Sequence, residues 1–245
     1  MIKIAVISDI HGNSWALEEV LKDIKAKSPD LIVNLGDILY GPLDPKGTFD
    51  ILKSLEMIHI SGNQDRAIIE CLETGPFNNT MKYVLDQLNL EAFDWLKSLP
   101  KTKILDCGVF LCHGTPNSDM IYLLEELNEN YRSVNNAKKI KELLNGVSQK
   151  IVFCGHSHFA RIEEIPGRTI INPGSVGLPA YDDDEPVYHK IENFHSHARY
   201  CMAEIDKGNI KIEQISVPYD FMKATEMAEI NQRQDWAKWL RTGMV

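Results

Sequence analysis

The sequence predicts an α/β protein, built as a four-layer α/β/β/α sandwich with two mixed β-sheets flanked by helices. Apolar, strand-like runs alternate with segments of helical spacing over about the first two-thirds of the 245 residues. Short strands without helical crossovers follow, and residues 219–241 read as a closing helix. We expect residues 1–245 to form a single domain, because no repeat, low-complexity segment or linker interrupts the pattern.

The first three strands are expected at IKIAVIS, LIVNLGD and MIHISGN. Leu17, Val20 and Ile24 recur at helical spacing after the first strand, and Pro29 ends that helix, so the chain begins with a βα unit. Residues 64–98 read as wholly helical, which is too long for a simple crossover. We interpret this segment as a helical insertion over one side of the sheet.

The fourth and fifth strands are expected at VFLCHG and IVFCGHSH. Residues 117–146 between them are predicted to be a second helical insertion, because their apolar residues recur at helical spacing. RIEEIP, GRTIINPG and ARYCMAEIDKGNIKIEQISVP follow as short strands, and the Lys207-Gly208-Asn209 turn predicts a hairpin. We assign the first five strands to one sheet and the later strands to a second, largely antiparallel sheet packed on it.

The composition is typical of a soluble globular protein and argues against two kinds of partner. A net charge of -9 and a pI near 5.4 argue against nucleic acid as the main partner. No run approaches the roughly 20 apolar residues that span a bilayer, and the amino-terminal run fits a buried strand better than a secretory signal. The five cysteines lack C-x-x-C spacing, so we expect reduced thiols and a cytoplasmic location.

Five short motifs, each after an apolar run, carry most of the chemistry of this sequence. Their metal-binding side chains are Asp9, His11, Asp37, Asn63, His113, His156 and His158. Ligands of open α/β sheets bind in the crevice outside the carboxyl ends of the strands, so we expect these residues to meet there. In an extended segment residues i and i+2 point the same way, which lets Asp9 and His11, or His156 and His158, face one ion.

The number of donors predicts two metal ions, because seven side chains are too many for a four-coordinate site. If one carboxylate bridges, two ions can lie about 3.5 to 4 Å apart, the separation used in two-metal phosphoester hydrolysis. Mixed carboxylate, amide and imidazole ligands without thiolate suit borderline transition metals. We expect two divalent ions, manganese first, with iron, zinc, nickel or cobalt as the other candidates.

In order, spacing and residue type the motifs resemble those of the calcineurin-like metallophosphoesterase superfamily. The start Asp9-Ile10-His11-Gly12-Asn13 and the segment Asn-Pro-Gly-Ser-Val-Gly at Asn172 resemble its small prokaryotic phosphodiesterases. The resemblance extends from Ile4 to about Asp206.

The resemblance implies a role for each motif residue. One metal would be held by Asp9, His11, Asp37 and His158. The other would be held by Asp37, Asn63, His113 and His156, with Asp37 bridging. It implies a metal-dependent phosphoric ester hydrolase in which a metal-bridging hydroxide attacks phosphorus, with Asp37, Asn63 and His113 as catalytic residues.

Four residues beside the ligands complete the expected site. Asn13, Gln64 and Ser157 are expected to contact the substrate. For Asn13 and Ser157, turn or helix-capping chemistry is an equally favoured alternative. Asp65 is expected to hydrogen-bond a neighbouring group and so support the ligands.

The sequence departs from the superfamily pattern at two positions. Many members have Gly-Asn-His-Asp or Gly-Asn-His-Glu, where the histidine helps to protonate the leaving group, whereas this chain has Gln64. Glutamine cannot donate a proton at neutral pH, so we predict a preference for good leaving groups such as aryl alcohols or nucleotide phosphates. After Asp37 the chain continues Ile-Leu-Tyr-Gly, without the Asp-Arg-Gly run of protein serine/threonine phosphatases and its phosphate-binding arginine.

The leading hypothesis is a phosphodiesterase that acts on a small-molecule phosphoester or nucleotide. A dinucleoside polyphosphate hydrolase is the alternative, because a pyrophosphate leaving group would tolerate Gln64. A binding scaffold of the same fold is the alternative from another class, and the complete ligand set argues against it.

The remaining histidines are not assigned to the metal cluster. His59 is interpreted as a core or edge residue of the third strand. His189, His195 and His197 lie in the charged segment 182–197, which we interpret as a solvated loop near the active-site rim in preference to a metal site or a gate. The aromatic residues of the carboxy-terminal helix, such as Trp236, are interpreted as packing residues.

Overall fold

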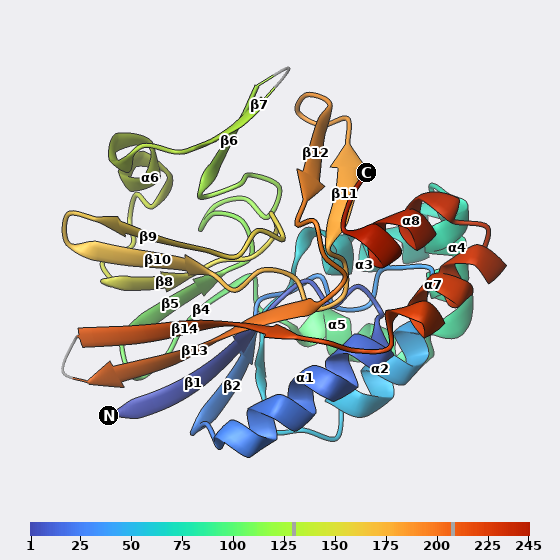
Figure 1. The fold of residues 1–245 in the computed structure, drawn as a ribbon, viewed down its shortest axis with the longest axis horizontal. Coiled ribbons are helices and arrows are strands. Elements are labelled where there is room, and N and C mark those ends of the chain that lie inside the picture. Colours follow the sequence, from blue (N-terminus) through green and yellow to red (C-terminus); the bar gives the residue numbers. More distant parts are fainter. Residues whose placement is uncertain (129–130, 207–208) are drawn as a thin grey trace.

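The computed structural model describes residues 1–128, 131–206 and 209–245. Two five-stranded mixed sheets pack against each other and helices cover their outer faces, which confirms the predicted four-layer sandwich (Figure 1). None of the described helices is both long and apolar enough to cross a membrane.

The first sheet is centred on β1. Its order is β14-β13-β1-β2-β3, with β1 Ile2–Ile7, β2 Leu31–Asn34, β3 Ile58–His59, β13 Ala198–Asp206 and β14 Asn209–Val217. β1 pairs in parallel with β2 and antiparallel with β13, so Ile4 lies opposite Leu31 on one side and Ala203 on the other.

The second sheet has the order β4-β5-β8-β10-β9. Its strands are β4 Thr102–Ile104, β5 Val109–Cys112, β8 Ile151–Phe153, β9 Arg161–Ile165 and β10 Arg168–Asn172. β8 lies between β5 and β10 and pairs in parallel with both, so the carboxyl ends of β5 and β8 share an edge.

The strands divide between the sheets differently from our prediction. The fourth and fifth predicted strands, now β5 and β8, belong to the second sheet, and β13 and β14 complete the first. The long helical segment after β3 allows the chain to move from one sheet to the other. β13 and β14 pair from Ala198↔Val217 to Asp206↔Asn209, as a hairpin requires, although Lys207 and Gly208 of the predicted turn lie outside the described residues.

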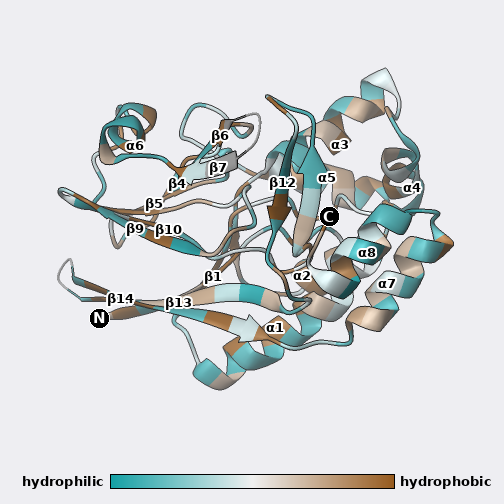
Figure 2. Ribbon diagram, turned by 45° about the horizontal axis from the view of Figure 1, so that its top comes forward, coloured by the Kyte–Doolittle hydropathy of each residue, from teal (hydrophilic) through white to brown (hydrophobic). Residues whose placement is uncertain are grey.

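The core between the sheets follows from the alternation of side chains along each strand. Ile4 and Val6 of β1 pack toward Leu111 and Phe153 of the second sheet. Ala5 and Ile7 point the other way, into the core beneath the helices. Figure 2 shows the resulting hydrophobic stretches along β1 and β5.

Seven helices contribute to the core on the outer face of the first sheet. They are α1 Ser14–Lys27, α2 Pro45–Leu52, α3 Asn63–Thr74, α4 Asn79–Gln87, α5 Leu90–Ser98, α7 Phe221–Ile230 and α8 Gln234–Thr242. The helical insertion predicted for residues 64–98 is confirmed as α3, α4 and α5. The closing helix predicted for residues 219–241 is two helices, because the chain turns at Gln232, which adopts a left-handed conformation with φ 58°.

The prediction of helices throughout residues 117–146 is wrong. This segment contains the antiparallel strands β6 Glu125–Asn128 and β7 Tyr131–Val134 and one helix, α6 Ala137–Leu143; residues 129–130 lie outside the described residues. Leu123 and Leu124 lie in an irregular stretch buried against the outer face of the second sheet. Their apolar character therefore reflects packing of the loop and not one face of a helix.

The segment 182–197 is not simply a solvated loop. β11 Ala180–Asp183 and β12 His189–Glu192 pair as an antiparallel hairpin close to α8 (Figure 1). His189 is buried, and its Nε2 lies 2.9 Å from the Tyr122 hydroxyl. The prediction that this segment lies near the rim of the site is taken up below.

Candidate metal centre

The seven predicted ligands all lie in turns that follow strands. Asp9 and His11 follow β1, and Asp37 follows β2. Asn63 begins α3 shortly after β3. The other three side chains, His113, His156 and His158, follow β5 and β8 of the second sheet. Because the carboxyl ends of these strands meet, residues from both sheets converge on one place.

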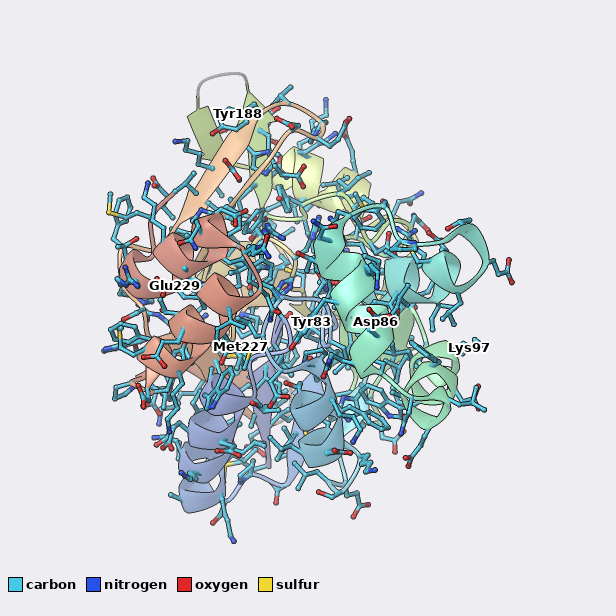
Figure 3. All side chains as sticks on the ribbon, turned by 90° about the vertical axis from the view of Figure 1, so that its right-hand side faces the viewer. Tyr83, Asp86, Lys97, Tyr188, Met227 and Glu229 are labelled. Carbon is cyan, nitrogen blue, oxygen red and sulfur yellow. The ribbon has the colours of Figure 1, made fainter. Side chains whose placement is uncertain are left out.

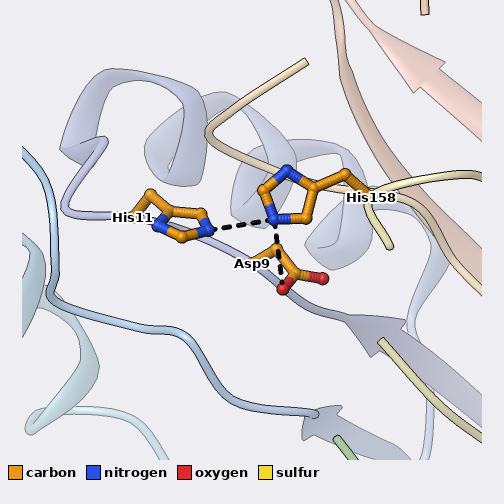
Figure 4. Close-up of side chains that lie close together, drawn as sticks. All are labelled: Asp9, His11 and His158. Atoms are coloured by element: carbon orange, nitrogen blue, oxygen red, sulfur yellow. Dashed lines mark hydrogen bonds and ion pairs between the residues drawn. The ribbon is translucent and has the colours of Figure 1, made fainter. Parts of the chain in front are cut away.

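The first group of potential ligands consists of Asp9, His11 and His158 (Figure 4). The Nε2 atoms of His11 and His158 are 3.0 Å apart, and Nε2 of His158 is 3.4 Å from Oδ1 of Asp9. All three side chains are buried. One cation at this point can be reached by all three.

The second group consists of Asp37, His113 and His156. Nε2 of His113 lies 3.4 Å from Oδ2 of Asp37 and 3.0 Å from Oδ1 of Asn63. Asn63 is therefore close enough to serve as a fourth ligand of the same ion.

The two groups adjoin through their carboxylates. Oδ2 of Asp37 is 3.9 Å from Nε2 of His11 in the first group, and Oδ1 of Asp9 is 4.0 Å from Nε2 of His113 in the second. Asp37 thus lies within reach of both groups.

Backbone carbonyls orient the histidine rings. Nδ1 of His11, His113 and His158 contacts the carbonyl oxygen of Tyr40, Leu35 and Leu178 at 3.0, 2.8 and 2.8 Å respectively. When Nδ1–H donates to a carbonyl, the Nε2 lone pair is left for a metal, and this is the usual arrangement around metal-binding histidines. All three Nε2 atoms point into the cluster.

The donor atoms fit divalent cations. Asp9 is fully buried, and neither carboxylate oxygen accepts a hydrogen bond. A buried carboxylate without a donor is costly, and two imidazole lone pairs 3.0 Å apart repel each other unless a proton or cation lies between them. A positive ion removes both penalties, which is the behaviour expected of a metal site.

The backbone is strained at five of these positions. The φ angles of Asp9, His11, Asp37, His156 and His158 lie between 51° and 68°, in the left-handed region that residues other than glycine rarely adopt. Such strain collects at functional sites, where the surrounding structure enforces it. The backbone of Gly62 also lies very close to the Asp37 side chain. A Cβ at Gly62 would lie 2.2 Å from Oδ1 of Asp37, so this position requires glycine.

Burial and charge set the protonation of the ligands. Burial, followed by the neighbouring His158 or His113, lowers the pKa of both His11 and His156 to about 4, so both rings are neutral at pH 7. Burial also acts to lower the pKa of His113, but the charge and hydrogen bond of Asp37 outweigh it and raise the pKa to about 10. The Asp37–His113 pair therefore holds a proton that a metal ion would replace.

Two of the residues expected beside the ligands are placed as predicted. Gln64 lines the cavity above the ligands, and its backbone N–H donates to Oδ1 of Asp37 at 2.8 Å. Asp65 accepts hydrogen bonds from the backbone N–H of Ile38 and of Gly62, both at 2.9 Å. Burial, and then the charge of Asp37, raise the pKa of Asp65 to about 7. Asp65 thus holds the backbone just after Asp37 and just before Asn63.

For Asn13 and Ser157 the structure favours the capping and turn alternative. Asn13 is fully buried, caps α1 by accepting from Ala16 N–H, and donates to the carbonyl of Gly177. Ser157 is fully buried as well and accepts a hydrogen bond from Asn172. Neither residue lines the cavity, so the expectation that they contact substrate is corrected.

The sequence did not identify several residues that surround the ligands. A cavity of about 310 Å³ opens over the metal ligands and is lined by Tyr40, Asn78, Arg233, Trp236 and Trp239 as well. Asp182 and Asp183 of the β11–β12 hairpin also line it, so this segment does lie at the rim. The Tyr122 and Tyr181 rings pack on His156 and His158 at 4.5 and 4.6 Å. No local motif marks these residues, because they reach the site only through tertiary packing.

The chain is similar in sequence and fold to known proteins along its whole length. Residues 2–206 match the calcineurin-like phosphoesterase superfamily domain. An uncharacterised protein of Methanocaldococcus jannaschii is 28% identical over 255 residues, covering 95% of this chain and 94% of that protein. The crystal structure of a metallophosphoesterase from Sphaerobacter thermophilus is 24% identical with a TM-score of 0.75, and that of a hypothetical protein from Pyrococcus horikoshii is 19% identical with a TM-score of 0.77, each covering 99% of both chains. With its two groups of buried candidate metal ligands, this chain belongs to the calcineurin-like phosphoesterase superfamily.

Proposed function

We propose that the protein is a dinuclear metal-dependent phosphodiesterase that hydrolyses phosphoesters with good leaving groups. The observation that carries this proposal is the pair of adjoining ligand groups on one cavity, Asp9, His11 and His158 beside Asp37, His113 and His156. A site with two adjoining cations suits in-line displacement at phosphorus. Manganese is the first candidate for both ions, since no thiolate lies in either group.

In this proposal Asp37 would help to hold both ions, because it lies within reach of both groups. Asn63 and His113 would complete the set of residues that hold the second ion. When bound, two such cations lower the pKa of a shared water and offset the charge on the phosphate oxygens. Hydrolysis would cleave one P–O bond: the phosphorus would gain the hydroxyl of water, the leaving group would depart as an anion, and the remaining proton of the water would pass to solvent.

The cavity favours a diester over a dinucleoside polyphosphate. Arg233 is the only lysine or arginine among the described residues that line it, and its guanidinium is paired with Asp235 at 2.6 Å. Asp182 and Asp183 line the same cavity. A polyphosphate chain would therefore meet carboxylates without matching cations, whereas a diester brings one negative charge to the metals.

Gln64 supports the preference for good leaving groups. It lines the cavity beside Asp37 at the position where many superfamily members have a histidine. An amide cannot protonate a departing alkoxide, so the enzyme depends on a leaving group that departs as a stable anion.

The test is an activity screen with and without added Mn²⁺. We expect hydrolysis of bis(p-nitrophenyl) phosphate to exceed that of dinucleoside polyphosphates and alkyl monoesters, with about two metal ions bound per chain. Asp37→Ala should reduce both the bound metal and kcat/KM, the latter by at least about a hundredfold. Turnover that is fastest on dinucleoside polyphosphates would favour the alternative hydrolase.

The binding-scaffold alternative predicts a different result. A chain that binds no stoichiometric metal and shows no metal-stimulated turnover would act through protein contacts instead. A cytoplasmic location is part of our proposal and agrees with the five free cysteines, since thiols stay reduced in that compartment.

A further inference from the structure

The carboxy-terminal helix α8 brings aromatic side chains to the metal ligands. Trp236 packs edge-on against the ring of His11, with centroids 5.9 Å apart, and its other neighbours are Trp239 at 6.1 Å and Tyr40 at 6.5 Å. All three residues line the cavity that opens over the metal-binding residues. The aromatic groups thus form a continuous wall that starts at a metal ligand.

The wall extends to the surface at Phe77. Its ring stacks on Tyr40 at 6.4 Å with an interplanar angle of 25°, and its neighbour in the chain, Asn78, lines the cavity and donates to the Tyr40 hydroxyl. Phe77 is 61% exposed, whereas Tyr40 is 8% and Trp236 is 3% exposed. We call Tyr40, Phe77, Trp236 and Trp239 the aromatic wall. The exposed fraction of these side chains increases from Trp236, next to His11, to Phe77 at the surface, which is typical of a cavity that opens to solvent.

The charges around this wall limit what it can hold. Arg233 lies over the Trp236 ring at 5.5 Å and is already paired with Asp235. Asp182 and Asp183 line the same cavity. A neutral, flat group suits this lining better than a second phosphate, because it can pack on the rings without adding negative charge.

We propose that the aromatic wall is a subsite for a nucleobase or aryl ring carried on one ester group of the substrate. The inference rests on the proposed phosphodiesterase function and names its substrate class: a phosphodiester with a flat aromatic substituent. A phosphate held at the candidate metal ligands would place that substituent beside the aromatic wall, since Trp236 packs against His11. The polar ends of Gln64 and Asn78 lie on the same cavity and can contact the edge of the ring.

The aromatic wall combines residues from inside and outside the part of the chain that matches the superfamily. The match ends at residue 206, so Trp236 and Trp239 lie beyond it, whereas Tyr40 and Phe77 lie within it. The proposed subsite therefore draws on a segment that the match to the superfamily does not include.

The experiment compares the binding of AMP and ribose 5-phosphate to the Mn²⁺-loaded protein by calorimetry. The two ligands share the sugar and the phosphate and differ in the base, so the ratio of their dissociation constants isolates the wall. We expect AMP to bind at least about tenfold more tightly, because a base gains this much from stacking on aromatic side chains. Trp239→Leu should bring the two constants within about twofold.

Two further variants keep the test decisive. Phe77→Ala removes the exposed end of the wall without touching the core and should lower the ratio by about threefold. Tyr188→Ala is the matched control, because Tyr188 is also exposed, at 51%, but lies near the tip of the β11–β12 hairpin away from α4 and α7 (Figure 3). If Trp239→Leu does not fold, the proposal is tested by comparing the ratio of the two dissociation constants in Phe77→Ala with the ratio in Tyr188→Ala.

Equal binding of AMP and ribose 5-phosphate to the unaltered protein overturns the subsite. A preference for AMP that survives both Trp239→Leu and Phe77→Ala, or that Tyr188→Ala lowers equally, overturns it as well. Failure of the proposed function has another signature: bis(p-nitrophenyl) phosphate is not hydrolysed, while the preference for AMP and its loss in the variants remain.

Discussion

At the scale of single residues, replacement of Gln64 should change which leaving groups the enzyme accepts. Gln64→His places an imidazole on the cavity beside Asp37, where it can protonate a leaving alkoxide. We expect kcat/KM for alkyl phosphomonoesters to rise at least about tenfold, since a positioned general acid contributes about 10²- to 10⁴-fold. Hydrolysis of bis(p-nitrophenyl) phosphate should change little, because p-nitrophenolate leaves without a proton.

Gln64→Asn is the control, since it shortens the side chain without supplying an acid. If the unaltered protein is already fast on alkyl monoesters and Gln64→His gains nothing, the role assigned to this position is wrong.

The convergence of the candidate metal ligands was predictable from their motifs, whereas the residues that line the cavity were not. Asp9 and His158 belong to motifs whose residue types suit metals and whose place after a strand fixes where they point. Trp236 belongs to no motif, and its helical spacing is the same whether it packs in a core or lines a cavity. For Asn13 the sequence left substrate contact and helix capping equally favoured, and only the structure shows that its amide oxygen caps α1.

At the scale of elements, strand β3 contains a titratable group that lies outside both ligand groups. His59 packs against Trp95 at 5.1 Å, and burial lowers its pKa from 6.5 to about 4. As the pH falls below about 6.5 the unfolded chain takes up a proton before the folded chain does. The free energy of unfolding should therefore decrease between pH 6.5 and pH 4, and this contribution should be fully retained above that range.

His59→Gln should flatten this part of the pH profile, as measured by the urea midpoint of unfolding at a series of pH values. His197→Gln, on an exposed residue, should leave the profile as it is. Equal slopes in His59→Gln and in the unaltered protein would show that other groups cause the acid sensitivity.

Elements with one strong periodic signal were predicted well, and elements that depend on a partner were not. The helices of residues 64–98 followed from their apolar spacing alone. β6 and β7 did not, because Glu125 and Val134 become a strand pair only when the two segments meet. The same reason explains the sheet assignment, since nothing local in β13 tells that it pairs with β1.

At the scale of the whole molecule, metal ions should hold the two sheets together. Asp9 and Asp37 belong to the first sheet's loops, whereas His113 and His158 belong to the second sheet's loops. A ligand that binds only the folded chain stabilises it by about 2.7 kcal/mol at a hundred times its dissociation constant. We therefore expect Mn²⁺ to raise the thermal midpoint by roughly 5 to 10 °C, and EDTA to reverse the shift.

Asp9→Asn tests the contribution of one carboxylate to this shift. Because Asp9 is buried and belongs to the first ligand group, the variant should gain less thermal stability from Mn²⁺ than the unaltered protein does. An Mn²⁺ shift as large as that of the unaltered protein would mean that Asp9 is not a ligand.

The division of ligands between the two sheets also bears on the order of events in folding. His11 and His158 are 147 residues apart in the chain, and His113 and Asn63 are 50 apart, so neither ligand group exists until distant segments have met. Contacts between segments so far apart in the sequence are slow to form, because the long loop between them must first be closed. Interactions absent from the transition state change the unfolding rate and leave the folding rate nearly as it was. We therefore expect metal ions to lengthen the lifetime of the folded chain without hastening its formation.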